Sequence, residues 1–408
     1  MNAAPVLTVV IPTRNRSEFA GRAVESALAE AAAVGATVLV SDNSTDAGER
    51  RLLYERCRRL GTARLRYVTP PEPLAMSPHW EWALGAALDG SDATHVLYLT
   101  DRMIFRPGEL ARVAEAVAVE PDRVLSYNND LVDDARRPIV VQLEAWSGRV
   151  VRVDTSRLLD LAARSIFSRA LPRMLNSVAP RSVLDELRVQ FGSVFESISP
   201  DYAFAFRCLA AEREVLFYDA PVVIAYGLDR SNGTSVTRGV ETSDTLDFLA
   251  DLGDVEPNYA APVPGFRLGA NGMIHEYCVA RDLVDGSRFP PVRRGRYLAR
   301  MARDAKLVED PVRRRQVDDL LRASGWSGWR RGAWSAVAAL EILAYYRDAH
   351  AILRRVVARL GETPAGRRML ARSRRLSIGR PPTFDDVDSA LAFAAARRGP
   401  RLAKSPRL

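Results

Sequence analysis

Apolar runs alternate with helical patterns over the first 130 residues. In residues 18–33, for example, Phe19, Ala23 and Ala27 recur at the spacing of one helix face. Strands that are almost continuously apolar and alternate with helices indicate a mostly parallel sheet covered by helices on both faces. The sequence therefore predicts an α/β fold. Its expected strands are residues 7–12, 37–42, 64–70, 95–101 and 123–130.

The pattern changes after about residue 138. Residues 138–154 read as a hairpin that turns at Ser147 and Gly148. The residues from about 290 to 375 are helical in pattern and rich in arginine, and the last twelve residues are expected to fray. We therefore expect three parts: an α/β domain over 1–240, a linking, irregular segment over 241–289 and a basic helical region over 290–408.

Composition indicates a soluble globular protein of more than one unit. The chain has 408 residues, of which 47% are hydrophobic and 26% are charged. The net charge of +8 is uneven. Residues 351–408 hold 14 basic and 4 acidic side chains, or +10, and the rest of the chain holds 44 and 46, or −2. The basic character therefore belongs to the C-terminal tail.

The compartment is inferred from cysteines and from apolar segments. Cys57, Cys208 and Cys278 are odd in number and far apart, which favours buried thiols in a reducing compartment. The N-terminus lacks the pattern of a signal peptide. The longest late apolar stretch has about 14 residues and contains Glu341, whereas a spanning helix needs roughly 20. We expect a cytoplasmic protein without a transmembrane segment.

Polar residues follow the first two strands, where a parallel sheet binds its ligands. PTRNR at 12–16 contains no glycine-rich signature for a dinucleotide or a phosphate loop. Arg14 and Arg16 either contact phosphates through their side chains or are solvated loop arginines. In SDNSTD at 41–46, Asp42 could accept hydrogen bonds from a base or ribose, whereas Ser44 is also explained as a helix cap.

Four segments occur in order: VVIPTRNR at 9–16, SDNSTD at 41–46, HWEWAL at 79–84 and LTDRMIFRP at 99–107. Together they resemble the nucleotide-sugar-binding half of the family 2 glycosyltransferases, which have the GT-A fold. The resemblance covers roughly residues 6–228, and its motifs are loose singly but fairly specific together. It implies that Asp42 contacts the nucleotide base. The donor-binding residues that it implies in these two loops are Thr13, Arg14, Asn15, Arg16, Asp42 and Ser44.

The same resemblance points to Asp101 and Arg102. The family has a run of acids before a hydrophobic pair, one residue and proline, and these acids hold Mg²⁺ or Mn²⁺ on the diphosphate. Here the run falls on Asp101, Arg102 and Met103, so one acid remains. Three alternatives are open. Asp101 is a lone metal ligand, Arg102 replaces the metal and binds the diphosphate, or the two form a plain salt bridge in an inactive site.

A candidate base lies in SPDYAFAFR at 199–207. The family often places Glu-Asp before a helix with an arginine six residues after the aspartate, and Asp201 and Arg207 keep that spacing. The resemblance implies that Asp201 removes the acceptor hydroxyl proton in an inverting transfer and that Arg207 binds substrate. Alternatively, Asp201 is a helix N-terminal residue favoured by the helix dipole.

We therefore expect a glycosyltransferase that moves a sugar from a nucleotide-sugar donor to a saccharide or lipid-linked acceptor, with Mg²⁺ or Mn²⁺ as a possible cofactor. The alternative is a non-catalytic nucleotide-sugar-binding relative or a subunit of a polysaccharide-assembly complex. The basic C-terminal helices could rest on an anionic membrane surface or pack on the catalytic domain. No recognised nucleic-acid-binding motif occurs, so we expect no nucleic-acid partner.

Overall fold

The computed structural model describes residues 5–238, 243–253, 259–263, 268–345 and 381–403. Its centre is an eleven-stranded sheet in which the order β11-β7-β6-β9-β4-β1-β2-β3 is continuous and β10 joins β6, β5 and β8. The strands are β1 (Leu7–Thr13), β2 (Thr37–Asp42), β3 (Leu65–Val68), β4 (His95–Tyr98), β5 (Met103–Phe105), β6 (Leu125–Asp133), β7 (Ile139–Gln142), β8 (Val150–Asp154), β9 (Ser177–Pro180), β10 (Glu214–Ala225) and β11 (Thr383–Phe384).

The sheet is mixed, and most of its strands run the same way. The pairings give one direction to β1, β2, β3, β4, β6, β10 and β11 and the opposite direction to β5, β7, β8 and β9. The expected α/β class with a mostly parallel sheet is therefore confirmed. The antiparallel β9 between β4 and β6 has no counterpart among the strands expected from the sequence.

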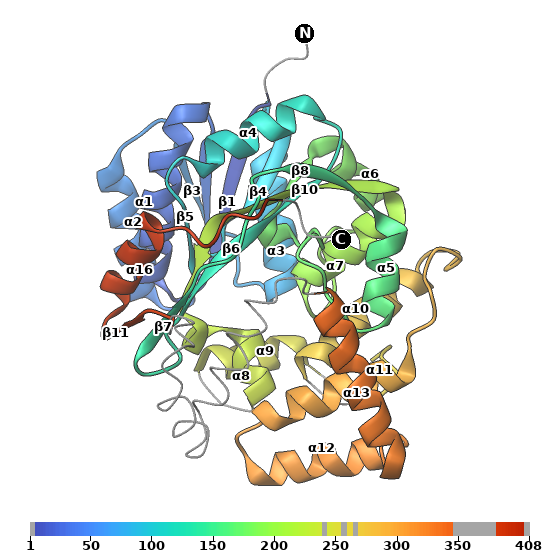
Figure 1. The fold of residues 1–408 in the computed structure, drawn as a ribbon. Coiled ribbons are helices and arrows are strands. Elements are labelled where there is room, and N and C mark those ends of the chain that lie inside the picture. The colour runs from blue at the N-terminus through green and yellow to red at the C-terminus, as the bar shows by residue number, and fades with distance from the viewer. Residues whose placement is uncertain (1–4, 239–242, 254–258, 264–267, 346–380, 404–408) are drawn as a thin grey trace.

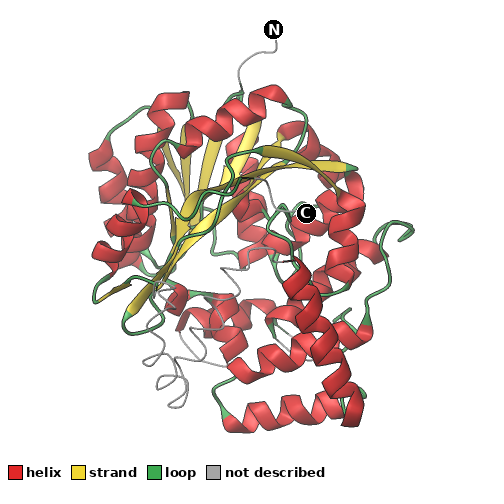
Figure 2. Ribbon diagram, viewed as in Figure 1, coloured by secondary structure: helices red, strands yellow, loops and turns green. Residues whose placement is uncertain are grey.

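Helices cover both faces of the sheet, as Figure 1 and Figure 2 show. Alternate residues of β1 explain why two cores form, because Val9 and Ile11 enter one core and Val10 enters the other. The first core is closed by α1 (Ser17–Val34), α2 (Ala47–Leu60) and α4 (Glu109–Val119). The second is closed by α3 (Met76–Leu88), α5 (Thr155–Ala163), α6 (Arg181–Phe191), α7 (Pro200–Ala211) and α10 (Gly269–Asp282).

The predicted hairpin over 138–154 is wrong. β7 pairs with β6 and β11, whereas β8 pairs with β10. At the expected turn, the backbone N–H groups of Ser147 and Gly148 donate to the carbonyl of Asp219, at 3.0 and 2.9 Å. The two apolar stretches therefore pair with different strands of the sheet instead of with each other.

The segment after β10 is largely helical. It contains α8 (Asn232–Arg238), α9 (Ser243–Leu252) and α10, followed by α11 (Arg294–Asp304), α12 (Pro311–Ala323) and α13 (Gly328–Tyr345). Ile274, Tyr277 and Cys278 of α10 are buried in the second core. The three-part division stays a prediction, but the described part of 241–289 holds two helices instead of an irregular linker. No helix in the described ranges is both long and apolar enough to cross a membrane.

The C-terminal segment, residues 381–403, returns to the sheet. β11 pairs with β7, and α16 (Val387–Ala396) follows it along the same edge of the sheet (Figure 1). Apolar side chains of α16 such as Leu391 pack into a small third core. The backbone N–H of Trp146 donates to the carbonyl of Pro400 at 3.1 Å, and its indole N–H donates to the carbonyl of Gly399 at 3.1 Å. The expected fraying is therefore wrong for the described part of the last twelve residues.

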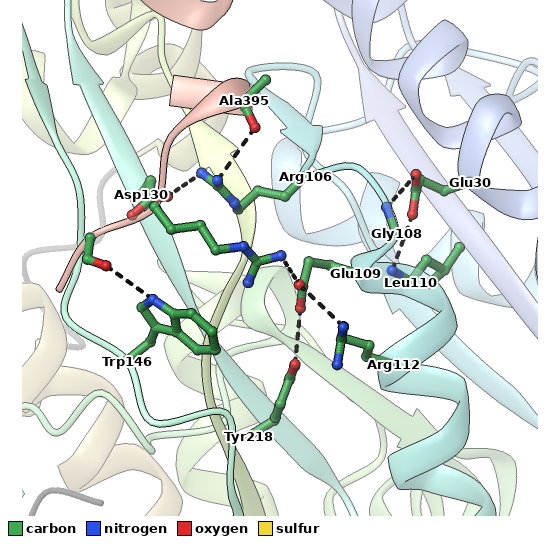
Figure 3. A network of polar contacts seen from close by, with 12 residues as sticks. Glu30, Arg106, Gly108, Glu109, Leu110, Arg112, Asp130, Trp146, Tyr218 and Ala395 are labelled. Atoms are coloured by element: carbon green, nitrogen blue, oxygen red, sulfur yellow. Dashed lines mark hydrogen bonds and ion pairs between the residues drawn. The ribbon is translucent and has the colours of Figure 1, made fainter. Parts of the chain in front are cut away.

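A buried charge network fastens this segment (Figure 3). Arg106 is 1% exposed and pairs with Asp130 at 2.5 Å. Its guanidinium also donates to the carbonyls of Ala394 and Arg397, at 2.6 and 2.5 Å. Buried charges are tolerated only when paired and hydrogen-bonded, so Arg106 depends on the C-terminal segment for partners.

Candidate active site

One large cavity opens at the carboxyl ends of β1 and β4. Its volume is about 1020 Å³, and its wall includes residues 12–16, 100–102 and 198–202. Parts of α3, α8, α9, α10 and α11 and the short turn at Ala305–Leu307 also line it. The structure thus brings the loop after β1, the loop after β4 and the start of α7 to a single space, as ligand binding at this edge of the sheet requires.

Asp101 lies between a hydroxyl and two guanidinium groups. It is 5% exposed, and its Oδ2 accepts a hydrogen bond from Thr13 Oγ1 at 3.0 Å. Its Oδ1 is 3.6 Å from Arg16 Nη1 and 3.9 Å from Arg102 Nε. Burial lowers the pKa of the Arg102 guanidinium, and the carboxylate of Asp101 opposes that shift. The predicted residues Thr13, Arg16, Asp101 and Arg102 therefore form one cluster in the cavity wall.

Gly227 fixes the position of Arg102. The Nη1 of Arg102 donates to the Gly227 carbonyl at 3.1 Å, and Gly227 has a φ of 65°. Asp134 accepts the backbone N–H groups of Gly227 and Leu228, both at 2.8 Å. A Cβ at Gly227 would lie 3.1 Å from Arg102 Cδ and 2.7 Å from Phe19 Cε1. The close approach of Arg102 to this turn therefore requires glycine.

The residues around Asp101 do not fit a metal site built by the chain. Within the described ranges, no group of three or more His, Cys, Asp or Glu side chains is arranged to hold a metal. Hard divalent cations need several oxygen ligands, and Asp101 has two guanidinium groups within 4 Å instead. Met103, at the position of the third expected acid, is 9% exposed and belongs to the first core.

Asn15 organises the loop between Arg14 and Arg16. It adopts the left-handed conformation, with a φ of 54°, which asparagine tolerates well. Its Oδ1 accepts the N–H groups of Thr45 and Asp46, at 2.9 and 3.0 Å, and its own N–H donates to Ser44 Oγ at 2.8 Å. Asn15 also lines the cavity. Its hydrogen bonds therefore tie a cavity-lining loop, the one after β1, to the loop after β2.

The structure places Asp42 and Ser44 behind the cavity wall. Asp42 is 0% exposed; its Oδ1 accepts the Ser44 N–H at 2.9 Å, and its Oδ2 accepts the Tyr67 hydroxyl at 2.5 Å. Asp46, not Ser44, caps α2. Asn43 is the residue of this loop that lines the cavity. Its Nδ2 donates to the Leu74 carbonyl, and its Oδ1 accepts the Leu74 N–H. Sequence reasoning missed it because the resemblance pointed to Asp42 and Ser44 in this loop.

Arg207 also lies away from the cavity. It is 3% exposed, and its Nη1 donates to Ser193 Oγ at 2.8 Å. Its Nη2 donates to the carbonyl of Glu196 at 2.6 Å. The side chain therefore holds the loop that precedes α7, which differs from the expected contact with substrate.

Asp201 lies in the first turn of α7 and lines the cavity. Its Oδ2 is 3.8 Å from Arg173 Nη1, and 17% of its side chain is exposed. Burial raises the pKa of the Asp201 carboxyl, and the charge of Arg173 offsets part of that shift. A partly exposed carboxylate with a raised pKa at a cavity wall is suited to accept a proton.

A buried acid that the sequence analysis did not single out supports the start of α7. Glu276 of α10 is 1% exposed, and its Oε1 accepts the N–H of Ser199 at 2.7 Å. Burial raises its pKa to about 8. No sequence signal links Glu276 to Asp201, because the two lie on different helices and Glu276 falls in the segment expected to be irregular.

Comparison with known proteins finds resemblance only among solved structures. No family model and no curated protein matches. A crystal structure of S. aureus TarS, residues 1–349, aligns with a TM-score of 0.41 at 15% identity, over 84% of this chain and 91% of that one. A second TarS crystal structure aligns with a TM-score of 0.42 at 13% identity, over 81% of this chain and 54% of that one. Similarity at this level says nothing of activity or substrate.

Proposed function

We propose that the chain is a family 2 glycosyltransferase with a GT-A-type domain. It binds a nucleotide-sugar donor in the cavity and transfers the sugar, with inversion, to a saccharide or lipid-linked acceptor. The observation that supports this most is the meeting of the 13–16 loop, the 100–102 loop and Asp201 in one cavity. The first two loops supply cations suited to a diphosphate, and Asp201 supplies a base.

The diphosphate would be bound by arginine. Arg16 and Arg102 both lie within 4 Å of Asp101 Oδ1, and a guanidinium binds phosphate oxygens bidentately with a permanent charge. A nucleoside diphosphate gains negative charge as it leaves, and preorganised cations stabilise that charge. Of the three alternatives for Asp101 and Arg102, the two guanidinium groups beside Asp101 favour the one in which Arg102 replaces the metal. We propose that binding requires no divalent cation.

Asp201 would act as the general base. Its carboxylate takes the proton of the acceptor hydroxyl while that oxygen attacks the anomeric carbon. The bond between the anomeric carbon and the diphosphate oxygen breaks on the opposite side, and the nucleoside diphosphate leaves with the bonding electrons. Burial raises the pKa of the Asp201 carboxyl, and Arg173, 3.8 Å away, opposes part of that rise.

We also propose peripheral contact with an anionic membrane surface through α13. Trp329 is 80% exposed and Leu340 is 65% exposed on this helix, with Arg330 and Arg331 beside the tryptophan. Exposed aromatic and aliphatic side chains next to arginine suit the headgroup region of anionic lipids. Such contact would bring a lipid-linked acceptor to the enzyme. Co-sedimentation with anionic vesicles that fails for Trp329→Glu would support this contact, and equal sedimentation would refute it.

The test of activity is the release of nucleoside diphosphate from UDP-, GDP- and dTDP-sugars, with Asp201→Asn beside the wild type. We expect turnover of one donor class and a loss of about 100-fold in Asp201→Asn, with nucleotide affinity unchanged. Asp185→Asn, at a carboxylate that is 54% exposed on α6, is the matched control. Equal turnover in Asp201→Asn would overturn the base. Nucleotide binding without turnover of any donor would favour the non-catalytic alternative.

A further inference from the structure

The segment that carries α8 and α9 contacts the two arginines of the loop after β1, Arg14 and Arg16. Asp251 of α9 places Oδ2 2.6 Å from Arg14 Nη1. Arg16 Nη2 donates to the carbonyl of Arg230 at 2.8 Å and contacts Asn232 Oδ1 at 3.4 Å. These three contacts join positions more than 200 residues apart in the chain, at the cavity where the diphosphate is proposed to bind.

A carboxylate and a phosphate group offer a guanidinium the same partner, a pair of anionic oxygens. The Asp251 side chain therefore stands where one phosphate oxygen of a ligand on Arg14 would stand. Both side chains of this ion pair are 26% exposed, so water reaches it. Exposed pairs of this kind are weak, and breaking one changes an equilibrium constant by about fivefold or less. The Arg14–Asp251 ion pair is thus strong enough to lower the affinity of a phosphate ligand for Arg14 and weak enough for such a ligand to displace Asp251.

We propose that Asp251 competes with phosphate for Arg14, and that a bound donor exchanges with this carboxylate. The exchange makes Asp251 a determinant of selectivity, because only a ligand with anionic oxygens can replace the lost partner of Arg14. Neutral ligands, such as a free nucleoside or sugar, gain nothing from Arg14 while Asp251 holds it. This inference rests on the proposed function, which places the donor diphosphate beside the β1 loop.

The test is calorimetric titration of the full chain with inorganic pyrophosphate. Asp251→Asn keeps the size of the side chain and removes its charge, so we expect it to bind pyrophosphate about fivefold more tightly than the wild type. Asp185→Asn is the control, because Asp185 is an exposed carboxylate on α6 that is not among the residues lining the cavity. We expect that control to change the affinity by less than about twofold.

A double-variant cycle separates competition from a general effect of charge. In the Arg14→Ala background, Asp251→Asn should have no effect, because the competed group is absent. Equal affinity of Asp251→Asn and wild type would overturn the inference, and so would a gain that persists in the Arg14→Ala background. If Arg102→Ala abolishes pyrophosphate binding while Asp251→Asn leaves it unchanged, the proposed function stands and this inference alone fails. If pyrophosphate binds to no variant, both fail.

Discussion

Glu276 offers a test of the turn that positions the proposed base. The side chain is 1% exposed, and one oxygen accepts the Ser199 N–H at 2.7 Å. Among the described residues, its Oε2 has no hydrogen-bond partner. Burial raises the pKa from an ordinary 4.5 to about 8, although Arg207 opposes the shift. At neutral pH the folded protein therefore holds Glu276 mostly protonated.

The direction of the resulting pH dependence follows from linkage. Between pH 4.5 and about 8 the folded chain keeps a proton that the unfolded chain has released. Stability therefore falls as the pH rises through this window, by about 1.4 kcal/mol per pH unit while the difference is one full proton. From pH 5.5 to 7.5, Glu276 alone would lower the free energy of unfolding by about 2 to 3 kcal/mol.

Glu276→Gln isolates this contribution, because glutamine resembles the protonated acid and does not titrate. Urea unfolding of both proteins at pH 5.5, 6.5 and 7.5 gives the free energy of unfolding at each pH. We expect the wild type to lose about 2 to 3 kcal/mol relative to Glu276→Gln across this range. Glu55→Gln, at a side chain that is 55% exposed, should run parallel to the wild type. Parallel lines for Glu276→Gln as well would refute the reasoning.

Two further substitutions test the fold around the site. Arg106→Met leaves Asp130 buried without its cation, so urea unfolding should show a free energy of unfolding lower by about 3–5 kcal/mol. The control is Arg51→Met, at a side chain that is 76% exposed, and an equally small loss in Arg106→Met would contradict this. Gly227→Ala places a methyl group 2.7 Å from Phe19 Cε1 at a φ of 65°, so it should destabilise the fold by about 1–3 kcal/mol and weaken pyrophosphate binding through Arg102. Gly332→Ala on α13, where an added Cβ meets nothing within 4 Å, should do neither, and wild-type behaviour of Gly227→Ala would rule out its positioning role.

The sequence predicted the parts of the molecule that local pattern governs. Alternation of apolar runs and helices gave the first four parallel strands, and their ends gave Arg16, Asp101 and Arg102, which do lie together. The position of Asp201 at a helix start was also read correctly. Their roles in binding and catalysis stay predictions.

Contacts between distant segments were beyond the sequence. A carboxylate after a strand reads the same whether it faces a ligand or, like Asp42, a tyrosine hydroxyl inside the wall. Arg207 kept the expected spacing and yet binds the loop before its own helix. The return of residues 381–403 depends on Arg106, which carries no local sign of a partner almost 300 residues away. Such pairings are decided by packing of the whole chain rather than by local propensity.

The most direct test of the central claim is calorimetric titration with UDP, GDP and dTDP, first in EDTA and then with Mn²⁺. We expect at least one of them to bind the wild type in EDTA, with a loss of about tenfold or more in Arg102→Ala that Mn²⁺ does not restore. Arg51→Ala should bind as the wild type does. Binding that requires Mn²⁺ and is the same in Arg102→Ala would contradict the account.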